Sequence, residues 1–452
     1  MQENMSYRNP FVIAIGKGVQ RLARLRGGGG SAAPGLVVDK IAPDFAPRVL
    51  GSLPFGVVVI SGTNGKTTTT KIVTELLESQ GLRVLTNDSG SNFMRGVIAA
   101  LLTKITWGGR LDADIAVLEL DEAHAVHFTK RVPPRYTLLL NVMPDQLDRF
   151  GSVEYTAGLL KQVAHNTTDK VIVNREDSLL AALGDAEELS SLSAQLRWFG
   201  LSDQLRGSFS RDGEEVARSY DAKRSHEAAH GQEAGRESRT ASVVLRAMEG
   251  NRATFEFDGS VLSAELMLKG LFNALNAAAA LALVAEVLGK DDPQRNRQLI
   301  DALAKVQSAF GRGESFVVKG HKIELLLVKN AGGFRLALDS FDSHGHTIMV
   351  AINDEFGDGR DVSWLFDVDF ASLREADAIV VSGTRAYDMA LRLGYDEISW
   401  QQIEADPLAA LDKLLSGEAK DSTPVRIYCT YTAMMKLRPY LEAQPDAKRV
   451  VG

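Results

Sequence analysis

A glycine turn between a β-branched run and an amphipathic stretch constrains the fold more than any other feature of this sequence. The segment VVVISGTNGKTTTTKIVTELL occupies residues 57–77. Its first residues are typical of a buried strand, and its last residues have helical spacing. A strand that enters a helix through a glycine turn exposes backbone N–H groups that can bind an anion. The sequence therefore predicts a phosphate-binding loop on an α/β sheet.

The residues of this turn each have a predicted contact with a nucleotide. Lys66 is expected to reach the outer phosphates, and the Thr67 hydroxyl is expected to bind Mg²⁺. The turn lacks the first glycine of the strict GxxxxGK[ST] pattern, because Ile60 stands in that place. The alternative is a tight strand-to-helix turn with a surface lysine. The predicted nucleotide-binding residues of the turn are Gly62, Thr63, Asn64, Gly65, Lys66, Thr67 and Thr68.

Polar residues after the neighbouring strand-like runs supply candidates for the metal and the substrate. Parallel sheets place ligands at the carboxyl ends of their strands. Glu119 lies at such an end and is the first choice for a Mg²⁺ carboxylate, while Asp121 and Glu122 either face substrate or cap the next helix. The polar run 87–92 is either a substrate contact or a polar turn. Further candidates for water and metal contacts are Asp145, Gln146 and Asp148.

The pattern of the whole chain indicates an α/β protein of two main domains. Short apolar runs alternate with helical patterns from about residue 55 to residue 200, which is typical of a mainly parallel sheet. Antiparallel strands follow over 241–268, and a second α/β region begins near residue 315. We expect an N-terminal basic amphipathic segment over 1–45, a central ATP-binding domain over 46–308, and a C-terminal α/β domain over 309–452.

Composition excludes several classes of site. The net charge is −7, so a nucleic-acid partner has no global electrostatic support. Cys429 is the only cysteine, which excludes a disulfide framework and a four-cysteine zinc site and fits a reducing cytoplasm. In its strand-like run Cys429 is expected to be a buried small residue. Residues 203–240 are rich in charge and predict an exposed insertion or a mobile loop, with no zinc ribbon.

The N-terminal segment predicts a basic amphipathic helix that ends at the glycines 27–30. Two readings of it stay open, a helix packed on the body of the protein and a helix that lies on an anionic membrane surface. The apolar positions are Phe11, Val12, Ile15, Val19, Leu22 and Leu25, and the basic positions are Lys17, Arg21, Arg24 and Arg26.

Three motifs in order, GTNGKTTTT, LELDEAH and NVMPDQLDRFG, resemble those of the Mur ligase superfamily. The stretches SAFGRGESF, NDEFGDGRDVSWLFDVDF and VVSGTRAYDMALRL make the chain most similar to the MurT family within it. This resemblance implies a Mur ligase-type central P-loop ATPase domain, followed by a Rossmann-like C-terminal domain. It also implies an ATP- and Mg²⁺-dependent ligase of peptidoglycan synthesis, placed at the inner face of the plasma membrane.

The activity implied by the resemblance is amidation of the D-glutamate α-carboxylate in the lipid II peptide stem to D-isoglutamine, through an acyl phosphate. Ammonia would come from a GatD-type glutaminase subunit in a heterodimer. Lys66 and Glu119 would serve catalysis, Asn273 and Asn276 would contact adenine, and Arg312 would contact ATP at the hinge. In the same way Asp361 would complete the partner's cysteine–histidine pair, with Asp358 as the near alternative.

Two other functions stay open from the sequence. One is a stand-alone amino-acid ligase of the Mur or folylpolyglutamate type, and the other is a non-catalytic scaffold that binds nucleotide and recruits a partner. The short segment before the phosphate loop and the GRDVSW block favour the amidating enzyme over the stand-alone ligase. The intact Gly-Lys-Thr of the turn and Glu119 favour a catalyst over a scaffold.

Overall fold

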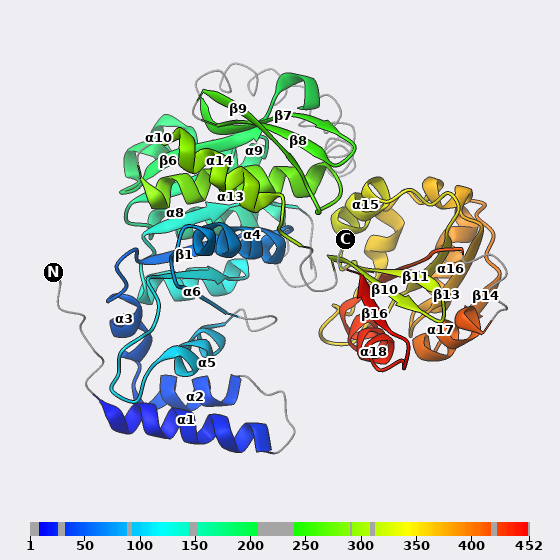
Figure 1. Ribbon diagram of the computed structural model, residues 1–452, viewed down its shortest axis with the longest axis horizontal. Helices are drawn as coiled ribbons and strands as arrows, with labels where there is room; N and C mark the ends of the chain where they lie inside the picture. Colours follow the sequence, from blue (N-terminus) through cyan, green and yellow to red (C-terminus); the bar gives the residue numbers. More distant parts are fainter. Residues whose placement is uncertain are drawn as a thin grey trace.

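Two sheets with covering helices form two units that lie side by side (Figure 1). The computed structural model describes residues 9–25, 32–87, 93–143, 152–206, 239–257, 259–289, 292–307, 312–416 and 423–450. The strands of the first sheet come from residues 57–265 and those of the second from residues 312–450. The predicted α/β fold class with mainly parallel sheets is confirmed.

In the part of the chain that the structure describes, the first sheet has nine strands in the order β2-β3-β1-β4-β5-β6-β7-β8-β9. All neighbours from β2 to β7 are parallel, and β7, β8 and β9 are antiparallel, as the sequence predicts for 241–268. The strands are β1 Val57–Ser61, β2 Val84–Thr86, β3 Ile115–Glu119, β4 Tyr136–Leu139, β5 Lys170–Asn174, β6 Gln195–Leu201, β7 Ala241–Glu249, β8 Arg252–Phe257 and β9 Ser260–Glu265.

Helices cover both faces of this sheet, and one of them is almost entirely apolar. The helix α13, Leu271–Leu288, is long and apolar enough to cross a membrane, yet most of it is buried. It packs against α4 and against strands β4–β7, so it is the central core helix of this unit. The other helices are α4 Lys66–Ser79, α5 Met94–Lys104, α6 Glu122–Arg131, α8 Val153–His165, α9 Ser178–Ala181, α10 Ala186–Ser191 and α14 Pro293–Leu303.

The second sheet, within residues 312–416 and 423–450, has seven strands in the order β14-β13-β12-β15-β11-β10-β16. The five strands from β14 to β11 are parallel, and β10 and β16 add antiparallel pairs at one edge. The strands are β10 Arg312–Val318, β11 His321–Leu327, β12 Thr347–Ala351, β13 Ala378–Ser382, β14 Gln402–Glu404, β15 Val425–Cys429 and β16 Lys448–Val450. The helices are α15 Ala331–Ser340, α16 Ala386–Tyr395, α17 Pro407–Leu415 and α18 Tyr431–Glu442, with short 3₁₀ turns η2 Ser363–Asp367 and η3 Ala371–Glu375.

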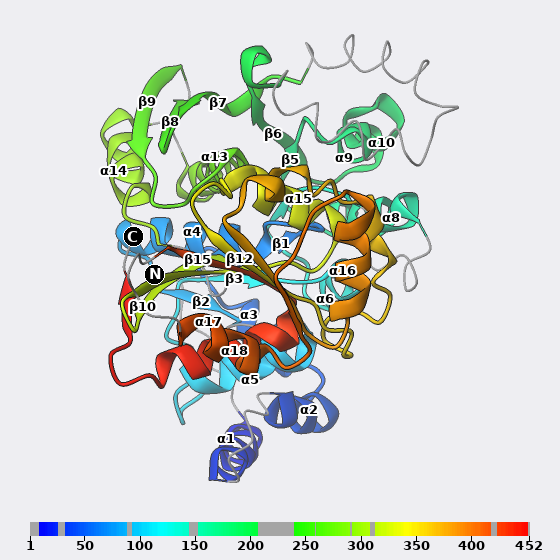
Figure 2. The same ribbon diagram turned by 90° about the vertical axis from the view of Figure 1, so that its right-hand side faces the viewer.

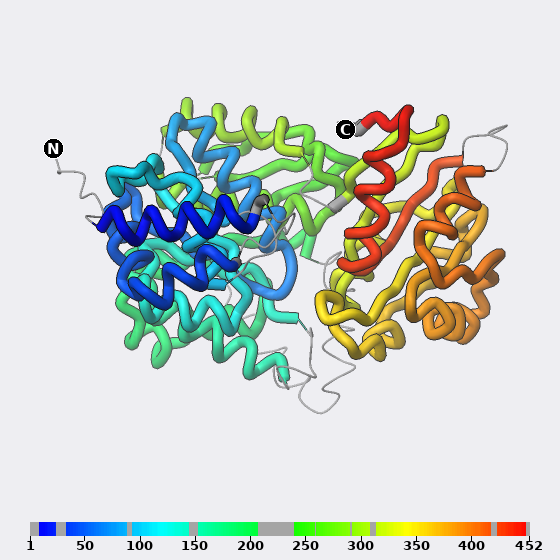
Figure 3. Tube along the Cα trace, turned by 90° about the horizontal axis from the view of Figure 1, so that it is seen from below, coloured from blue at the N-terminus to red at the C-terminus, as the bar shows by residue number. Residues whose placement is uncertain are grey.

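Among the described residues, three helices precede the first strand, namely α1 Pro10–Leu25, α2 Ala32–Ile41 and α3 Phe45–Leu50. The helix α1 packs on α2 and α5 and lies across the end of the molecule that Figure 3 shows from below. The predicted helix is therefore present and packed on the body. The apolar residues expected in this helix differ in exposure. Val12 is buried, whereas Phe11, Ile15 and Leu22 are exposed.

Contacts join the two units close to the start of α13. The Lys269 ammonium lies 3.3 Å from the buried Glu324 carboxylate, and Gly270 lies against the Ser340 side chain at the end of α15. Figure 2 looks onto the second unit and shows α15 near α13. This arrangement places α15 beside the carboxyl ends of the central strands of the first sheet.

Candidate functional site

The predicted phosphate turn connects β1 to α4 and needs glycine at two positions. Gly62 has φ +136°, and a Cβ there would lie 3.0 Å from the backbone nitrogen and oxygen of Asn141. Gly65 has φ +87°, and a Cβ there would lie 2.5 Å from the Asn276 amide oxygen. Side chains are strained at such φ values, and they would also crowd Asn141 and Asn276.

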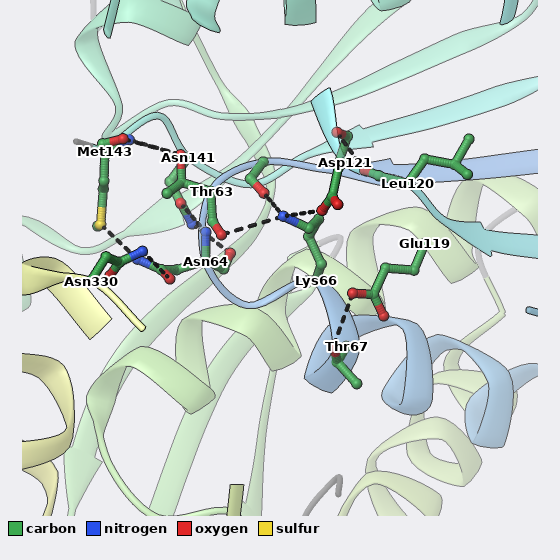
Figure 4. A network of polar contacts seen from close by, with 12 residues as sticks. Thr63, Asn64, Lys66, Thr67, Glu119, Leu120, Asp121, Asn141, Met143 and Asn330 are labelled. Carbon is green, nitrogen blue, oxygen red and sulfur yellow. Dashed lines mark hydrogen bonds and ion pairs between the residues drawn. The ribbon is translucent and has the colours of Figure 1, made fainter. Parts of the chain in front are cut away.

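Lys66 folds back across this turn, as Figure 4 shows. Its side chain is only 6% exposed, its Nζ donates to the Gly62 carbonyl at 2.6 Å, and it lies 3.3 Å from the Asp121 carboxylate. The ammonium is therefore fixed over the turn, next to the N-terminus of the 14-residue α4. A buried cation beside a helix N-terminus is an environment that favours bound phosphate. Asp121 pairs with Lys66, and its side chain makes no cap hydrogen bond to α6.

Thr67 and Glu119 bring two hard oxygen ligands together. The Thr67 hydroxyl donates to a Glu119 carboxylate oxygen at 2.9 Å. The backbone of Glu119 is held in turn by Asn87, whose amide accepts from Glu119 N–H at 2.9 Å and donates to its carbonyl at 2.7 Å. A hydroxyl and a carboxylate beside a phosphate turn fit Mg²⁺, which prefers oxygen ligands. Within the described residues there is no group of three or more His, Cys, Asp or Glu side chains that could hold a metal.

Asn141 holds the turn in place, and the sequence reasoning missed it. Its carbonyl accepts from Thr63 N–H at 2.9 Å, its amide oxygen accepts from Asn64 N–H at 2.8 Å, and its amide nitrogen donates to the Asn64 carbonyl at 2.9 Å. The adjacent Val142 N–H donates to Asp177 at 2.6 Å. Burial raises the pKa of Asp177 to about 6, although backbone N–H groups of Val142, Leu180 and Leu179 act to lower it. The only signal in the sequence was an asparagine soon after an apolar strand.

The second unit contributes the N-terminus of α15 to the site, which the sequence reasoning also missed. Asn330 caps this helix by accepting from Gly333 N–H at 2.7 Å, and its amide nitrogen lies 3.4 Å from the Asn64 amide oxygen. A Cβ on Gly332 would lie 3.1 Å from the Met143 sulfur. The run Asn-Ala-Gly-Gly after a strand was the available signal. Two helix N-termini, those of α4 and α15, therefore converge on one turn.

Asn276 of α13 lies against the turn. Its amide nitrogen is buried and has no hydrogen-bond partner among the described residues, while its amide oxygen lies against Gly65. A buried donor without a partner is costly unless a ligand accepts from it, so this atom fits a nucleotide at the turn. Asn273 donates to the Lys269 carbonyl. Arg312 begins β10, and its side chain lies outside the described residues. Adenine and ATP contacts for these three residues stay predictions.

The two acids of the GDGRD segment have different environments. Asp358 is buried and accepts from the Thr432 N–H at 2.7 Å, from the Thr432 hydroxyl and from the Glu355 N–H at 3.2 Å. Asp361 is exposed and accepts from the Ser363 N–H at 2.8 Å. Asp358 therefore holds a loop to the start of α18, whereas the Asp361 carboxylate faces solvent.

Two known families match this chain, one in each unit. Residues 60–284 match the Mur ligase middle domain, and residues 327–434 match the MurT ligase C-terminal domain. The second match covers α15, α16, Asp358 and Asp361. The chain belongs to the MurT family of Mur ligase-like proteins.

Individual relatives agree with this assignment. The chain is 28% identical to "Lipid II isoglutaminyl synthase (glutamine-hydrolyzing) subunit MurT" of Streptococcus pneumoniae (strain ATCC BAA-255 / R6), over 95% of both chains. It is 27% identical to the protein of the same name in Staphylococcus aureus (strain COL), over 85% of this chain and 87% of that one. The MurF ligase from Thermotoga maritima in complex with ADP shares the fold, with a TM-score of 0.61, 18% identity, and coverage of 89% and 82% of the two chains.

Other predicted residues of this MurT family member fall into two groups. Cys429 is fully buried in β15, as predicted, and burial raises the pKa of its thiol well above the usual range. Such a thiol does not ionise to a nucleophile near neutral pH. The remaining predictions lie outside the described residues, namely Asp145, Gln146, Asp148, the run 88–92 and most of the insertion, 207–238.

Proposed function

We propose that this chain is the synthetase subunit of a glutamine-dependent enzyme that amidates the D-glutamate α-carboxylate in the lipid II peptide stem to D-isoglutamine. The observation that carries the proposal is a phosphate turn with Lys66, Thr67 and Glu119 in place, in a chain similar, over 95% of its length, to a protein named as a lipid II isoglutaminyl synthase subunit. The partner would be a GatD-type glutaminase in a heterodimer, because the relatives are named as subunits of a glutamine-hydrolysing enzyme.

The turn supports ATP as the activating substrate. Lys66, the N–H groups of the first turn of α4 and the buried amide nitrogen of Asn276 are cationic or donating groups beside the phosphate turn. Thr67 and Glu119 would hold Mg²⁺, which would neutralise charge on the phosphates. The N-terminus of α15 would add a second positive helix end from the other unit.

These groups suit the activation of a carboxylate. A carboxylate oxygen attacks the γ-phosphorus of ATP, the bond to ADP breaks, and an acyl phosphate forms. Neutral ammonia then attacks the acyl carbon, inorganic phosphate leaves with the bonding electrons, and the resulting ammonium group loses a proton to give the amide. Lys66 stabilises the charge that develops on the transferred phosphoryl group. Contact between Asn330 and Asn64 brings the two units together over the turn and helps to exclude water, which would hydrolyse the acyl phosphate.

A separate glutaminase is the expected source of ammonia. Glutamine hydrolysis of this kind needs a cysteine nucleophile activated by a histidine. The sole cysteine, Cys429, is buried with a raised pKa, so this chain would not hydrolyse glutamine by itself. Asp361 is exposed, and only one of its two carboxylate oxygens accepts the hydrogen bond from Ser363 N–H. The other oxygen would be able to accept a hydrogen bond from the histidine of a partner's cysteine–histidine pair.

An exposed and largely aromatic surface on α16 and η2 suits a protein partner. Tyr387, Leu391 and Tyr395 recur every four residues on one face of α16, and all three are exposed. Phe366 of η2 packs edge-on against Tyr395 with ring centroids 5.9 Å apart and is exposed as well. Clustered exposed aromatic side chains are typical of interfaces, where tyrosine is a frequent hot spot.

The test uses lipid II, ATP and Mg²⁺ with the purified chain. Ammonium is expected to give an amide product with the chain alone, and Lys66→Met is expected to abolish it. Replacement of ammonium by amino acids distinguishes the alternative, a stand-alone amino-acid ligase, because that enzyme would join the amino acid and add its mass. A nucleotide-binding scaffold would give neither product and no substrate-dependent ATP hydrolysis.

A further inference from the structure

The helix α1 is fixed to the body of the protein by one face only. Ile13 is fully buried, and Val12 is buried beside it. A Cβ on Gly16 would lie 2.6 Å from a methyl group of Leu102 in α5 and 2.8 Å from one of Val38 in α2. The glycine therefore lets α1 pack closely against both helices. The orientation of α1 about its own axis is set by this contact.

The opposite face of α1 is apolar and exposed. Phe11 is 78% exposed, Ile15 46% and Leu22 61%. Residues separated by four and by seven positions lie on one side of a helix, so these three side chains form one stripe. The other face of α1 is already buried against the protein. The exposed stripe can therefore be shielded from water only by a further binding partner.

Basic and aromatic residues flank this stripe. The Lys17 ammonium lies 5.3 Å and the Arg21 guanidinium 5.7 Å from the ring centroid of Trp107, which is itself 53% exposed. The sequence of α1 contains no aspartate or glutamate, although the whole chain carries a net charge of −7. Positive charge and a half-exposed tryptophan beside an apolar stripe are the composition of helices that lie in membrane interfaces.

We propose that α1 and Trp107 form a membrane-docking face that binds the surface of an anionic phospholipid bilayer. Phe11, Ile15 and Leu22 would enter the boundary between headgroups and acyl chains. Lys17 and Arg21 would contact the phosphate groups. Charge favours this occupant over a second copy of the chain docked through the same face, because α1 carries basic residues and no acidic ones, so two copies of it would repel each other. The role in catalysis rests on the proposed function, in which the substrate is carried by a lipid.

The helix α5 connects this docking face to the candidate site. Leu102, near its C-terminal end, contacts α1, while Phe93, immediately before its N-terminus, packs edge-on against His124 of α6 with ring centroids 4.0 Å apart. The helix α6 follows β3, which ends at Glu119. Eleven residues of helix span about 16 Å. A peptide attached to a membrane-bound headgroup would therefore have a short path from the bilayer to the Mg²⁺ ligands.

Co-sedimentation with vesicles tests the docking face without reference to catalysis. The intact chain is mixed with vesicles of phosphatidylcholine alone and with vesicles that also contain phosphatidylglycerol. Binding is expected to the anionic vesicles and to weaken as salt is added. The double substitution Phe11→Ser with Leu22→Ser is expected to weaken binding by about tenfold or more, because it removes apolar contacts.

Two further variants complete the experiment. Lys17→Gln with Arg21→Gln is expected to abolish the preference for anionic vesicles. Leu189→Ser with Val261→Ser removes two exposed apolar side chains from α10 and β9 and is expected to bind like the parent. Thermal unfolding checks that each variant is folded.

Several outcomes would overturn the inference and leave the proposed function untouched. These are absence of parent binding to anionic vesicles, equal loss of binding in both apolar double variants, or sedimentation velocity that shows a dimer dispersed by Phe11→Ser. If the docking face is correct, the variant with Phe11→Ser and Leu22→Ser should amidate a soluble stem peptide at the parent rate when ammonium is the nitrogen source. The same variant should amidate lipid II in vesicles more slowly than the parent does. Failure of amidation in every sample would instead count against the proposed function.

Discussion

Substitution of Asp361 should separate glutamine-driven from ammonium-driven amidation. Asp361 is exposed, and its structural contact is one accepted hydrogen bond from Ser363 N–H at 2.8 Å. Asp361→Asn keeps an oxygen for this bond, so the free energy of unfolding should change by less than about 0.5 kcal/mol. Loss of the acid from a triad typically lowers the rate by about 10²–10⁴-fold. We therefore expect a fall of this size with glutamine and the parent rate with ammonium.

Asp358 provides the matched control, since it lies three residues away and is buried. Asp358→Ala leaves two N–H groups and the Thr432 hydroxyl without their acceptor. Loss of hydrogen bonds to a buried carboxylate should cost about 3–5 kcal/mol in unfolding free energy. This variant should therefore lose stability and both activities together.

The assay follows amide formation on lipid II by mass, with the partner present and with either nitrogen source, and chemical denaturation gives the unfolding free energies. The reasoning would be refuted by an Asp361→Asn protein that uses glutamine at the parent rate. It would equally be refuted by an Asp358→Ala protein with parent stability that loses only the glutamine-driven reaction, because that result would exchange the roles of the two acids.

Three further changes have expected outcomes. Lys66→Met should lower substrate-dependent ATP hydrolysis by about 10³-fold or more with either nitrogen source, measured as phosphate release, since the variant lacks the buried cation at the turn. Glu119→Gln should raise the Mg²⁺ concentration for half-maximal activity by about tenfold or more, and an unchanged Mg²⁺ dependence would exclude this carboxylate as a ligand. Burial raises the pKa of Asp177 to about 6, so between about pH 4 and pH 6 the folded state binds a proton that the unfolded state has lost. The contribution of this group to the free energy of unfolding should therefore fall by up to about 3 kcal/mol as the pH rises through that window. Asp177→Asn should flatten that part of the stability profile in denaturation measured across pH.

Local features of the site were predictable because a few adjacent residues specify them. The turn Gly62–Thr67 needs only a preceding strand, two glycines and a following helix, and the structure has these at the predicted residues. Glu119 was predicted from its place at the end of a strand. The parallel register of β1 and β3 then places its carboxylate 2.9 Å from Thr67.

Contacts between distant segments were not predictable from the sequence alone. Asn141 and Asn330 lie 77 and 266 residues from Asn64, and both contact it. No local pattern states which asparagine meets which turn, because strand order and the closure of the two units decide it. The same limit applied to α1, in which periodicity showed an apolar side but packing through Gly16 decides that Phe11 and Leu22 stay exposed.

The most direct test of the central claim is the mass of lipid II after reaction with this chain, ATP and Mg²⁺, with and without a GatD-type glutaminase. The account predicts conversion of acid to amide with ammonium in both samples and with glutamine only when the glutaminase is present. An amino acid joined to the substrate, or an amide from glutamine with this chain alone, would contradict it.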